Sequence, residues 1–116
     1  MKALLLLATL TLGIAIGAAA QAPAAQAPDG QALYRDNCRV CHGTDGVPPQ
    51  RMMTLYKNLR ALDSAYLAGR SEDSLVIMIR DGVGTMKPYK DRLTQEQTVA
   101  IAKYVKTLAS AAWKEP

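Results

Sequence analysis

Residues 38–42 read C-R-V-C-H, with thiols at Cys38 and Cys41 and the only histidine of the chain at His42. Cysteines at positions i and i+3 of a helical turn lie near one face, so both can bond to the two vinyl groups along one side of a porphyrin. The histidine that follows offers its imidazole to the iron. The run is the attachment signature of a c-type haem and predicts one haem c, bound covalently through Cys38 and Cys41.

Other uses of a C-x-x-C pair are a thioredoxin-like dithiol, half of a zinc site and a structural disulfide. Zinc would need two further ligands, and the chain holds two cysteines and one histidine in all. A thioredoxin-type pair begins a helix after a strand, and the residues before Cys38 do not read as a strand. The sequence therefore favours haem attachment.

The N-terminal segment predicts export. Lys2 precedes an apolar stretch over residues 3–20 that ends in three alanines. This pattern indicates a secretory signal peptide over residues 1–20, cleaved after Ala20, and hence a periplasmic protein. An uncleaved segment would be nearly long enough to span a bilayer, so we expect a membrane association only if it is retained.

Residues 21–28, Q-A-P-A-A-Q-A-P, show no periodicity and contain two prolines, which predicts a flexible linker. The remaining residues, 29–116, form one small domain whose side chains alone would make a thin core. A haem would add the missing apolar mass. The formal net charge of +4 comes without a block of Lys and Arg, which argues against binding to nucleic acid.

Helical spacing and helix-end signals predict an all-α domain with about four helices. The first runs from about Gly30 into the signature, with Asp29 as its N-cap. A second lies within Leu59–Ala68 and is ended by Gly69.

A third helix begins after Ser71 and is followed by Gly82. The apolar run 75–79 within it resembles a strand in composition, but the end signals favour a helix. Thr94 and Gln97 form a capping box for the last helix. An apolar stripe follows there, flanked by Tyr104 and made of Ile101, Val105, Leu108 and Ala112.

Over nearly all of residues 30–108 the chain resembles the class I cytochromes c, which are small monohaem proteins. In that family a glycine eight residues before the first haem cysteine and an aromatic residue four before it cross the C-terminal helix. Gly30 and Tyr34 occupy these places, and Ile101 and Tyr104 look like their partners. A glycine without Cβ lets the helices approach closely, while the aromatic ring fills the angle between them. The resemblance implies the small cytochrome c fold around one haem.

The second axial ligand cannot be a histidine, because His42 is the only histidine of the chain, and four methionines compete for the place. The candidates are Met52, Met53, Met78 and Met86. Met78 lies in an apolar helical run, where methionine usually fills gaps, and the family uses the stretch with Met52 and Met53 to line the haem edge. The resemblance places Met86, in the glycine-rich loop 82–89, as the sixth ligand.

Two departures from the family pattern occur near the ligands. Proline usually follows the ligand methionine directly, whereas here Lys87 precedes Pro88, and a deprotonated lysine amine could replace sulfur at alkaline pH. Pro48 stands where a second glycine is common after the signature. We expect the carbonyl of Pro48 or Pro49 to accept a hydrogen bond from the His42 ring.

Ligation by His42 and Met86 leaves the iron no open position, so the resemblance implies a one-electron carrier and not an enzyme. Thioether ligation raises the reduction potential, which suits a carrier between a periplasmic dehydrogenase as donor and a terminal oxidase or peroxidase as acceptor. Two alternatives stay open. One is a haem module with an open sixth position, for gas binding or peroxidase-like activity, and the other is the cytochrome subunit of a periplasmic dehydrogenase complex.

Cations cluster after the proposed ligand, at Lys87, Lys90 and Arg92. The family exposes one haem edge near this loop, so positive charge there would steer the edge toward acidic patches on redox partners. Arg51, Lys57 and Arg60 are further cations that could add to this charge. The alternative is an ordinary solvated face.

Overall fold

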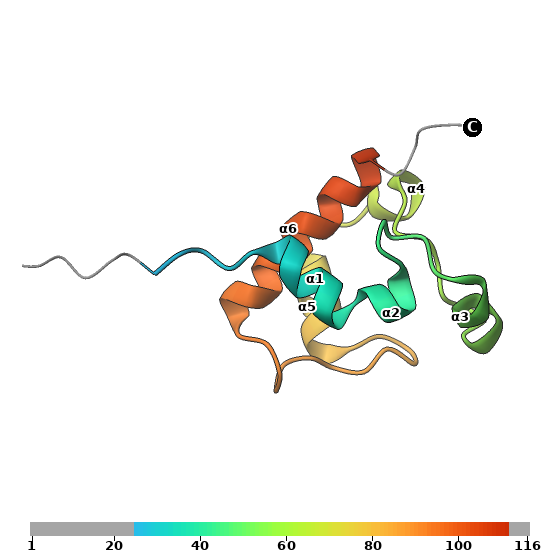
Figure 1. Ribbon diagram of the computed structural model, residues 1–116, viewed down its shortest axis with the longest axis horizontal. Helices are drawn as coiled ribbons and strands as arrows, with labels where there is room; N and C mark the ends of the chain where they lie inside the picture. Colours follow the sequence, from blue (N-terminus) through green and yellow to red (C-terminus); the bar gives the residue numbers. More distant parts are fainter. Residues whose placement is uncertain (1–24, 112–116) are drawn as a thin grey trace, which may run out of the picture.

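The computed structural model describes residues 25–111, and Figure 1 shows how their helices are arranged. They are α1 (Gly30–Asn37), α2 (Arg39–His42), α3 (Gln50–Leu55), α4 (Ser64–Leu67), α5 (Glu72–Asp81) and α6 (Gln95–Ala111). Apart from an isolated bridge between Val83 and Met86, these residues form no β-structure. The predicted all-α fold is confirmed.

Some predictions fall beyond the described part of the chain. The signal peptide over residues 1–20, the first half of the linker over 21–28 and Ala112 of the apolar stripe lie outside it. The domain boundaries therefore stay predictions. Among residues 25–111, no helix is long and apolar enough to cross a bilayer.

The helix ends that the sequence marks are found where predicted. The Asp29 carboxylate accepts hydrogen bonds from the first backbone N–H groups of α1 at 3.0 and 3.1 Å. Ser71 Oγ accepts the N–H of Ser74 at the start of α5, which ends at Gly82 with φ of 76°. At the start of α6, Thr94 and Gln97 exchange backbone-to-side-chain bonds of 2.9 and 3.2 Å. These caps satisfy N–H groups that have no partner inside the helix.

The helix predicted within residues 59–68 is present as α4 (Ser64–Leu67), but it occupies only the later part of that range. The Asp63 carboxylate accepts the N–H of Tyr66 at 2.8 Å, so helix α4 begins only at residue 64. The preceding segment is held elsewhere, because the N–H of Leu62 donates to the carbonyl of Gly46 at 2.8 Å. Residues 59–62 therefore do not continue the helix, because the long-range bond to Gly46 holds them against the turn after the signature.

Two further differences concern α1 and α3. The predicted first helix is interrupted at Cys38, which ends α1 and begins α2. Helix α3 was not predicted, and none of its residues is buried. A short helix without a buried stripe lacks the periodic pattern by which helices are found in sequences.

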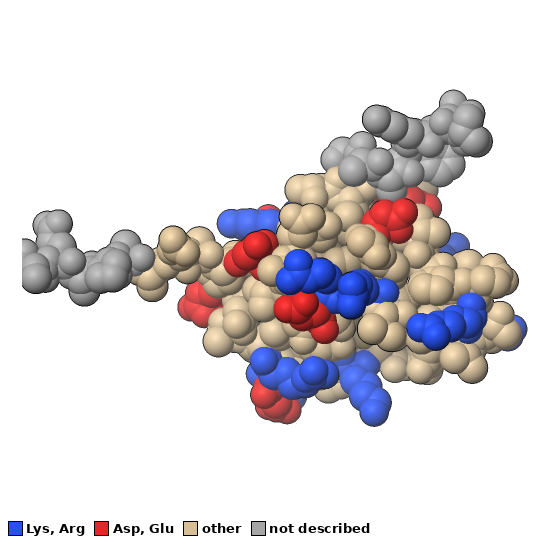
Figure 2. Space-filling model, viewed as in Figure 1, with Lys and Arg blue, Asp and Glu red and all other residues tan. Residues whose placement is uncertain are grey.

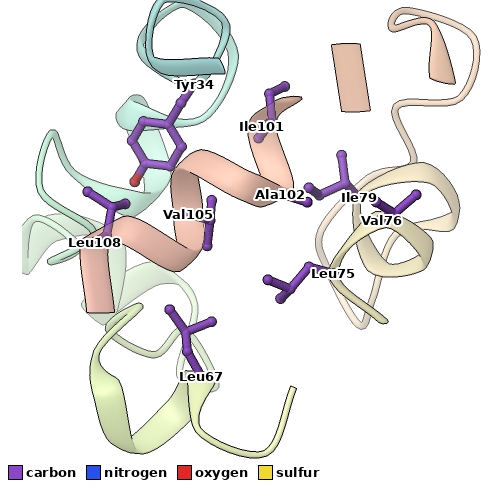
Figure 3. Close-up of a cluster of buried hydrophobic side chains, with 9 residues drawn as sticks. All are labelled: Tyr34, Leu67, Leu75, Val76, Ile79, Ile101, Ala102, Val105 and Leu108. Atoms are coloured by element: carbon purple, nitrogen blue, oxygen red, sulfur yellow. The ribbon is translucent and has the colours of Figure 1, made fainter. Parts of the chain in front are cut away.

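Helix α6 lies at the centre of the core, against α1, α5 and α4 (Figure 3). The buried hydrophobic side chains are Tyr34, Leu67, Leu75, Val76, Ile79, Ile101, Ala102, Val105 and Leu108. Those of α6 stand in the middle, with the Tyr34 ring on one side and the α5 side chains on another. Both segments expected to carry axial ligands are therefore attached to helices that pack on α6.

The crossing of α1 and α6 has the predicted form. A Cβ atom at Gly30 would collide with the backbone carbonyl of Ala100, so only glycine permits this approach. Tyr34 is 2% exposed, and its ring lies against that of Tyr104 with centroids 5.3 Å apart. The close approach and the ring pair together fix where α1 lies on α6.

We expect Gly30→Ala to lower the free energy of unfolding of the haem-loaded protein by about 1–3 kcal/mol, because the added methyl group forces the two helices apart. Denaturant titration measures this. Gly69→Ala is the matched control, since a Cβ there meets no atom within 4 Å. Equal losses in the two variants would contradict the close-packing explanation.

Candidate haem site

The signature forms a single helical turn that begins at Cys38. The carbonyl of Cys38 accepts the N–H groups of Cys41 and His42 at 3.2 and 3.0 Å. Gly43 ends the turn with φ of 76°, and a side chain there would collide with the Val47 carbonyl. The two cysteines, half-buried and not joined to each other, are therefore held one turn apart.

A buried tyrosine ties this turn to the core. The Tyr34 hydroxyl donates to the carbonyl of Gly43, directly after His42, at 2.8 Å. Burial raises the pKa of Tyr34 far above its ordinary value, and nearby Cys38 and Tyr104 act in the same direction. The hydroxyl therefore stays protonated and keeps donating at any physiological pH.

The surroundings of Cys38 argue against thioredoxin-like dithiol chemistry, and the residues near it argue against a zinc site. Burial, reinforced by Cys41, raises the pKa of Cys38 to about 11, so its thiol is protonated at neutral pH. A thioredoxin-like nucleophile needs the opposite shift. Moreover, residues 25–111 contain no group of three or more His, Cys, Asp or Glu that could hold a metal ion.

His42 is suited to bind iron through a neutral ring. Burial lowers its pKa, so the imidazole is uncharged at neutral pH, the form that donates a lone pair to a metal. Its Nδ1 atom is buried and, among the described residues, has no hydrogen-bond partner. A buried imidazole with an unpaired nitrogen is unusual, and it is expected where the ring serves a bound group.

The expected bond from His42 to a proline carbonyl is absent from the structure, so this prediction is corrected. The Pro49 carbonyl accepts the N–H groups of Met52 and Met53 at 2.8 and 3.2 Å, in the first turn of α3. Neither it nor the carbonyl of Pro48 is paired with Nδ1 in the described part of the chain. Because α3 was not predicted, this competing use of the Pro49 carbonyl was missed.

The loop that carries Met86 folds back against the end of α5. Met86 and Val83 exchange backbone hydrogen bonds of 2.9 and 3.2 Å around Gly84, whose φ is 57°. A Cβ at Gly82 would press on the backbone of residues 86–88. Glycine at both positions thus allows the tight turn, and Met86 lies half-buried against the core.

A side chain from the same loop reaches the signature. The Tyr89 hydroxyl donates to the carbonyl of Asn37, the residue before Cys38, at 3.0 Å. Figure 1 shows the tip of this loop on the same side of the molecule as α2 and α3, away from residues 25–29. The structure therefore brings the predicted sites at Cys38, His42 and the Met86 loop into one region. Asn37 and Tyr89 were not predicted, because their contact spans 52 residues.

The other three candidate methionines lie on helices. Met52 is half-buried and Met53 is 36% exposed, both on α3, whereas Met78 lies on α5 and packs against the core. Only Met86 lies on a loop bonded to the segment that leads into the signature.

Large apolar side chains are exposed around this region. They come from the signature, the turn after it, α3 and its end, and the Met86 loop, and are Val40, Val47, Met53, Leu55, Tyr56 and Val83. Val47, Leu55 and Tyr56 were not predicted; the signal for them is their apolar character in a segment without helical periodicity. Exposed apolar surface of this kind fits a large flat hydrophobic group. Together with the paired thiols and the neutral imidazole, it defines a protein built to hold one haem.

Comparison with known proteins agrees with this site. Residues 25–105 match the family model described as cytochrome C oxidase, cbb3-type, subunit III. Chloroplastic cytochrome c6 of Chlamydomonas reinhardtii is 36% identical over 99 residues, which cover 83% of this chain and 64% of that protein. Cytochrome c6 of Thermosynechococcus vestitus is 32% identical over 94 residues, covering 78% of this chain and 80% of the relative.

Solved structures give the same result. The c-type cytochrome KustC0563 superposes with a TM-score of 0.63 at 32% identity, covering 69% of this chain and 96% of that one. The chain therefore belongs to the class I cytochromes c, small monohaem proteins that carry electrons and are not enzymes. It carries one covalently bound haem c, as the signature predicts.

We expect Cys38→Ala or Cys41→Ala to weaken haem retention, and the double variant to give a largely unfolded apoprotein, because the haem completes a thin core. Haem staining after denaturing electrophoresis and thermal circular dichroism measure the two effects. A cooperative thermal transition in a haem-free double variant would show that the side chains suffice to fold the domain.

Proposed function

We propose that this cytochrome is a periplasmic one-electron carrier, with haem attached through Cys38 and Cys41 and iron bound by His42 and Met86. When bound, haem iron takes up or releases one electron. The hydrogen bond between Tyr89 and Asn37 is the main support, because it links the Met86 loop to the residue before Cys38. Two protein ligands leave no open position for a substrate.

The choice of Met86 rests on where the four candidate methionines lie. Met78 belongs to α5 and packs against the core, a place where methionine fills space. Met52 and Met53 lie on α3, which follows His42 closely in the chain. Of the four, only Met86 lies on a loop, whose turn depends on Gly82 and Gly84 and which reaches the signature from the end of α5.

The proposed location rests on residues 1–20, whose composition is that of a cleaved signal peptide. The domain of residues 29–116 would then work in the periplasm. Its donor would be a dehydrogenase and its acceptor a terminal oxidase or peroxidase, since a His/Met haem has a potential suited to that position.

A second candidate is a cytochrome subunit held in a larger complex, because the matching family model is described as an oxidase subunit. Purification from native membranes and extract distinguishes the two. A free carrier elutes alone, whereas a subunit co-purifies with a partner in fixed ratio.

We expect Met86→Ala to abolish the near-infrared sulfur–iron charge-transfer band, lower the reduction potential and admit added ligands such as imidazole. Met78→Ala should keep the band and instead cost about 2 kcal/mol of unfolding free energy, because it leaves a cavity beside the core. Loss of the band in Met78→Ala with its survival in Met86→Ala would refute the assignment.

The cations near the Met86 loop are exposed and free to act on partners. Lys87, Lys90 and Arg92 are all exposed, as are Arg51 and Lys57. The one salt bridge of the described chain joins Arg35 and Asp36. Figure 2 shows Lys and Arg on the surface over α3 and along the edge beneath α2. Charge placed there would raise the rate of encounter with anionic partners.

We expect Lys90→Glu to slow oxidation of the reduced protein by hexacyanoferrate(III), an anionic probe, by about two- to tenfold at low salt. Stopped-flow kinetics should show the difference fading as ionic strength rises. Lys103→Glu, an equal charge change at an exposed site on α6, is the control. Lys106 is unsuitable, because its ammonium donates to the Arg70 carbonyl at 2.7 Å. Equal slowing by both reversals would mean that net charge alone governs the encounter.

A further inference from the structure

Tyr89 joins the Met86 loop to two helices at once. Its backbone N–H donates to the carbonyls of Ile79 and Arg80, near the end of α5, at 3.0 and 3.1 Å. Its hydroxyl donates to the carbonyl of Asn37, the last residue of α1, at 3.0 Å. Within the described chain, this is the one hydrogen bond that connects residues 82–90 to α1 or α2.

The acceptor of that bond is itself held firmly. The side-chain amide of Asn37 donates to the carbonyl of Leu33 at 2.9 Å, one turn back in α1. Cys38 follows directly, and its own N–H donates to the Tyr34 carbonyl at 2.8 Å. The Tyr89 hydroxyl is therefore anchored to a rigid point at the entrance to the signature.

The donor is suited to a lasting bond. Tyr89 is half-buried and packs against the core, and the Arg92 guanidinium lies 5.2 Å from its ring centroid. Burial raises the pKa of Tyr89, with Cys38 adding to the effect. The phenol is therefore protonated at neutral pH and partly shielded from competing water.

Tyr89 is also closely coupled to Met86. Only Lys87 and Pro88 lie between them, and proline restricts the backbone of this short connection. On its other side Met86 is bonded to Val83 in the tight turn. A displacement of Tyr89 away from Asn37 would therefore move the Met86 backbone with it.

We propose that Tyr89 is a positioning residue that latches the Met86 loop to the haem-bearing segment and so limits how often the sixth ligand leaves the iron. The inference rests on the proposed ligation by Met86. With the hydroxyl bond lost, backbone bonds would hold the loop to α5 alone, and its open form would become more populated. External ligands bind in proportion to that open population.

Tyr34 supplies a matched control. Its hydroxyl also donates to a backbone carbonyl beside the signature, that of Gly43, at 2.8 Å. Tyr34→Phe thus removes the same chemical group on the His42 side, without touching the Met86 loop. Because Tyr34 is more deeply buried than Tyr89, its loss of a hydroxyl should weaken the whole fold at least as much.

The test compares Tyr89→Phe and Tyr34→Phe in the haem-loaded ferric protein by imidazole titration, amide hydrogen exchange and denaturant unfolding. We expect Tyr89→Phe to tighten apparent imidazole binding about three- to tenfold, the effect of one lost net hydrogen bond on the open population. Exchange at the Met86 and Tyr89 amides should quicken by a similar factor. Tyr34→Phe should change imidazole binding less than twofold.

Equal changes in imidazole binding by the two variants would overturn the latch, since both would then act through general stability. A wild-type protein without the sulfur–iron band would instead contradict Met86 ligation. Amide exchange would still test whether Tyr89 holds the loop closed, because it reports loop opening whether or not Met86 binds iron. Faster exchange at Met86 in Tyr89→Phe than in Tyr34→Phe supports the latch, and equal exchange refutes it.

Discussion

The close crossing of α1 and α6 is the contact on which the haem site depends. Because Gly30 has no side chain, the α1 backbone rests against the carbonyl of Ala100. This closeness lets the Tyr34 ring enter the core beside Tyr104 while its hydroxyl reaches Gly43. The signature that follows α1 is thus attached directly to the core, which gives His42 a defined position.

The same central helix supports the other half of the site. Helix α5 packs on α6, and the loop that carries Met86 returns to the end of α5 through backbone bonds of Tyr89. The two proposed axial ligands are therefore placed by separate elements that share one packing partner. Preorganisation of this kind lets a carrier change oxidation state with little rearrangement of the protein.

Burial keeps the site electrically neutral. It lowers the pKa of His42 and raises that of Tyr34, so neither side chain adds charge beside the haem at neutral pH. A neutral apolar environment disfavours extra positive charge on the iron and so supports a higher reduction potential. Charged groups such as Lys87 and Lys90 are exposed to solvent instead.

By itself, the sequence determined the features that depend on neighbouring residues. The signature at 38–42 and the caps at Asp29 and Thr94 depend on residues no more than four positions apart, so they can be predicted from the sequence. The close crossing at Gly30 was also predictable, through the family resemblance. Only the tertiary structure decided that the Pro49 carbonyl serves α3, that α4 starts late, and that Tyr89 bonds to Asn37. These outcomes depend on contacts between residues far apart in the sequence. Such contacts override the local helix propensity wherever a long-range bond or burial stabilises the chain more.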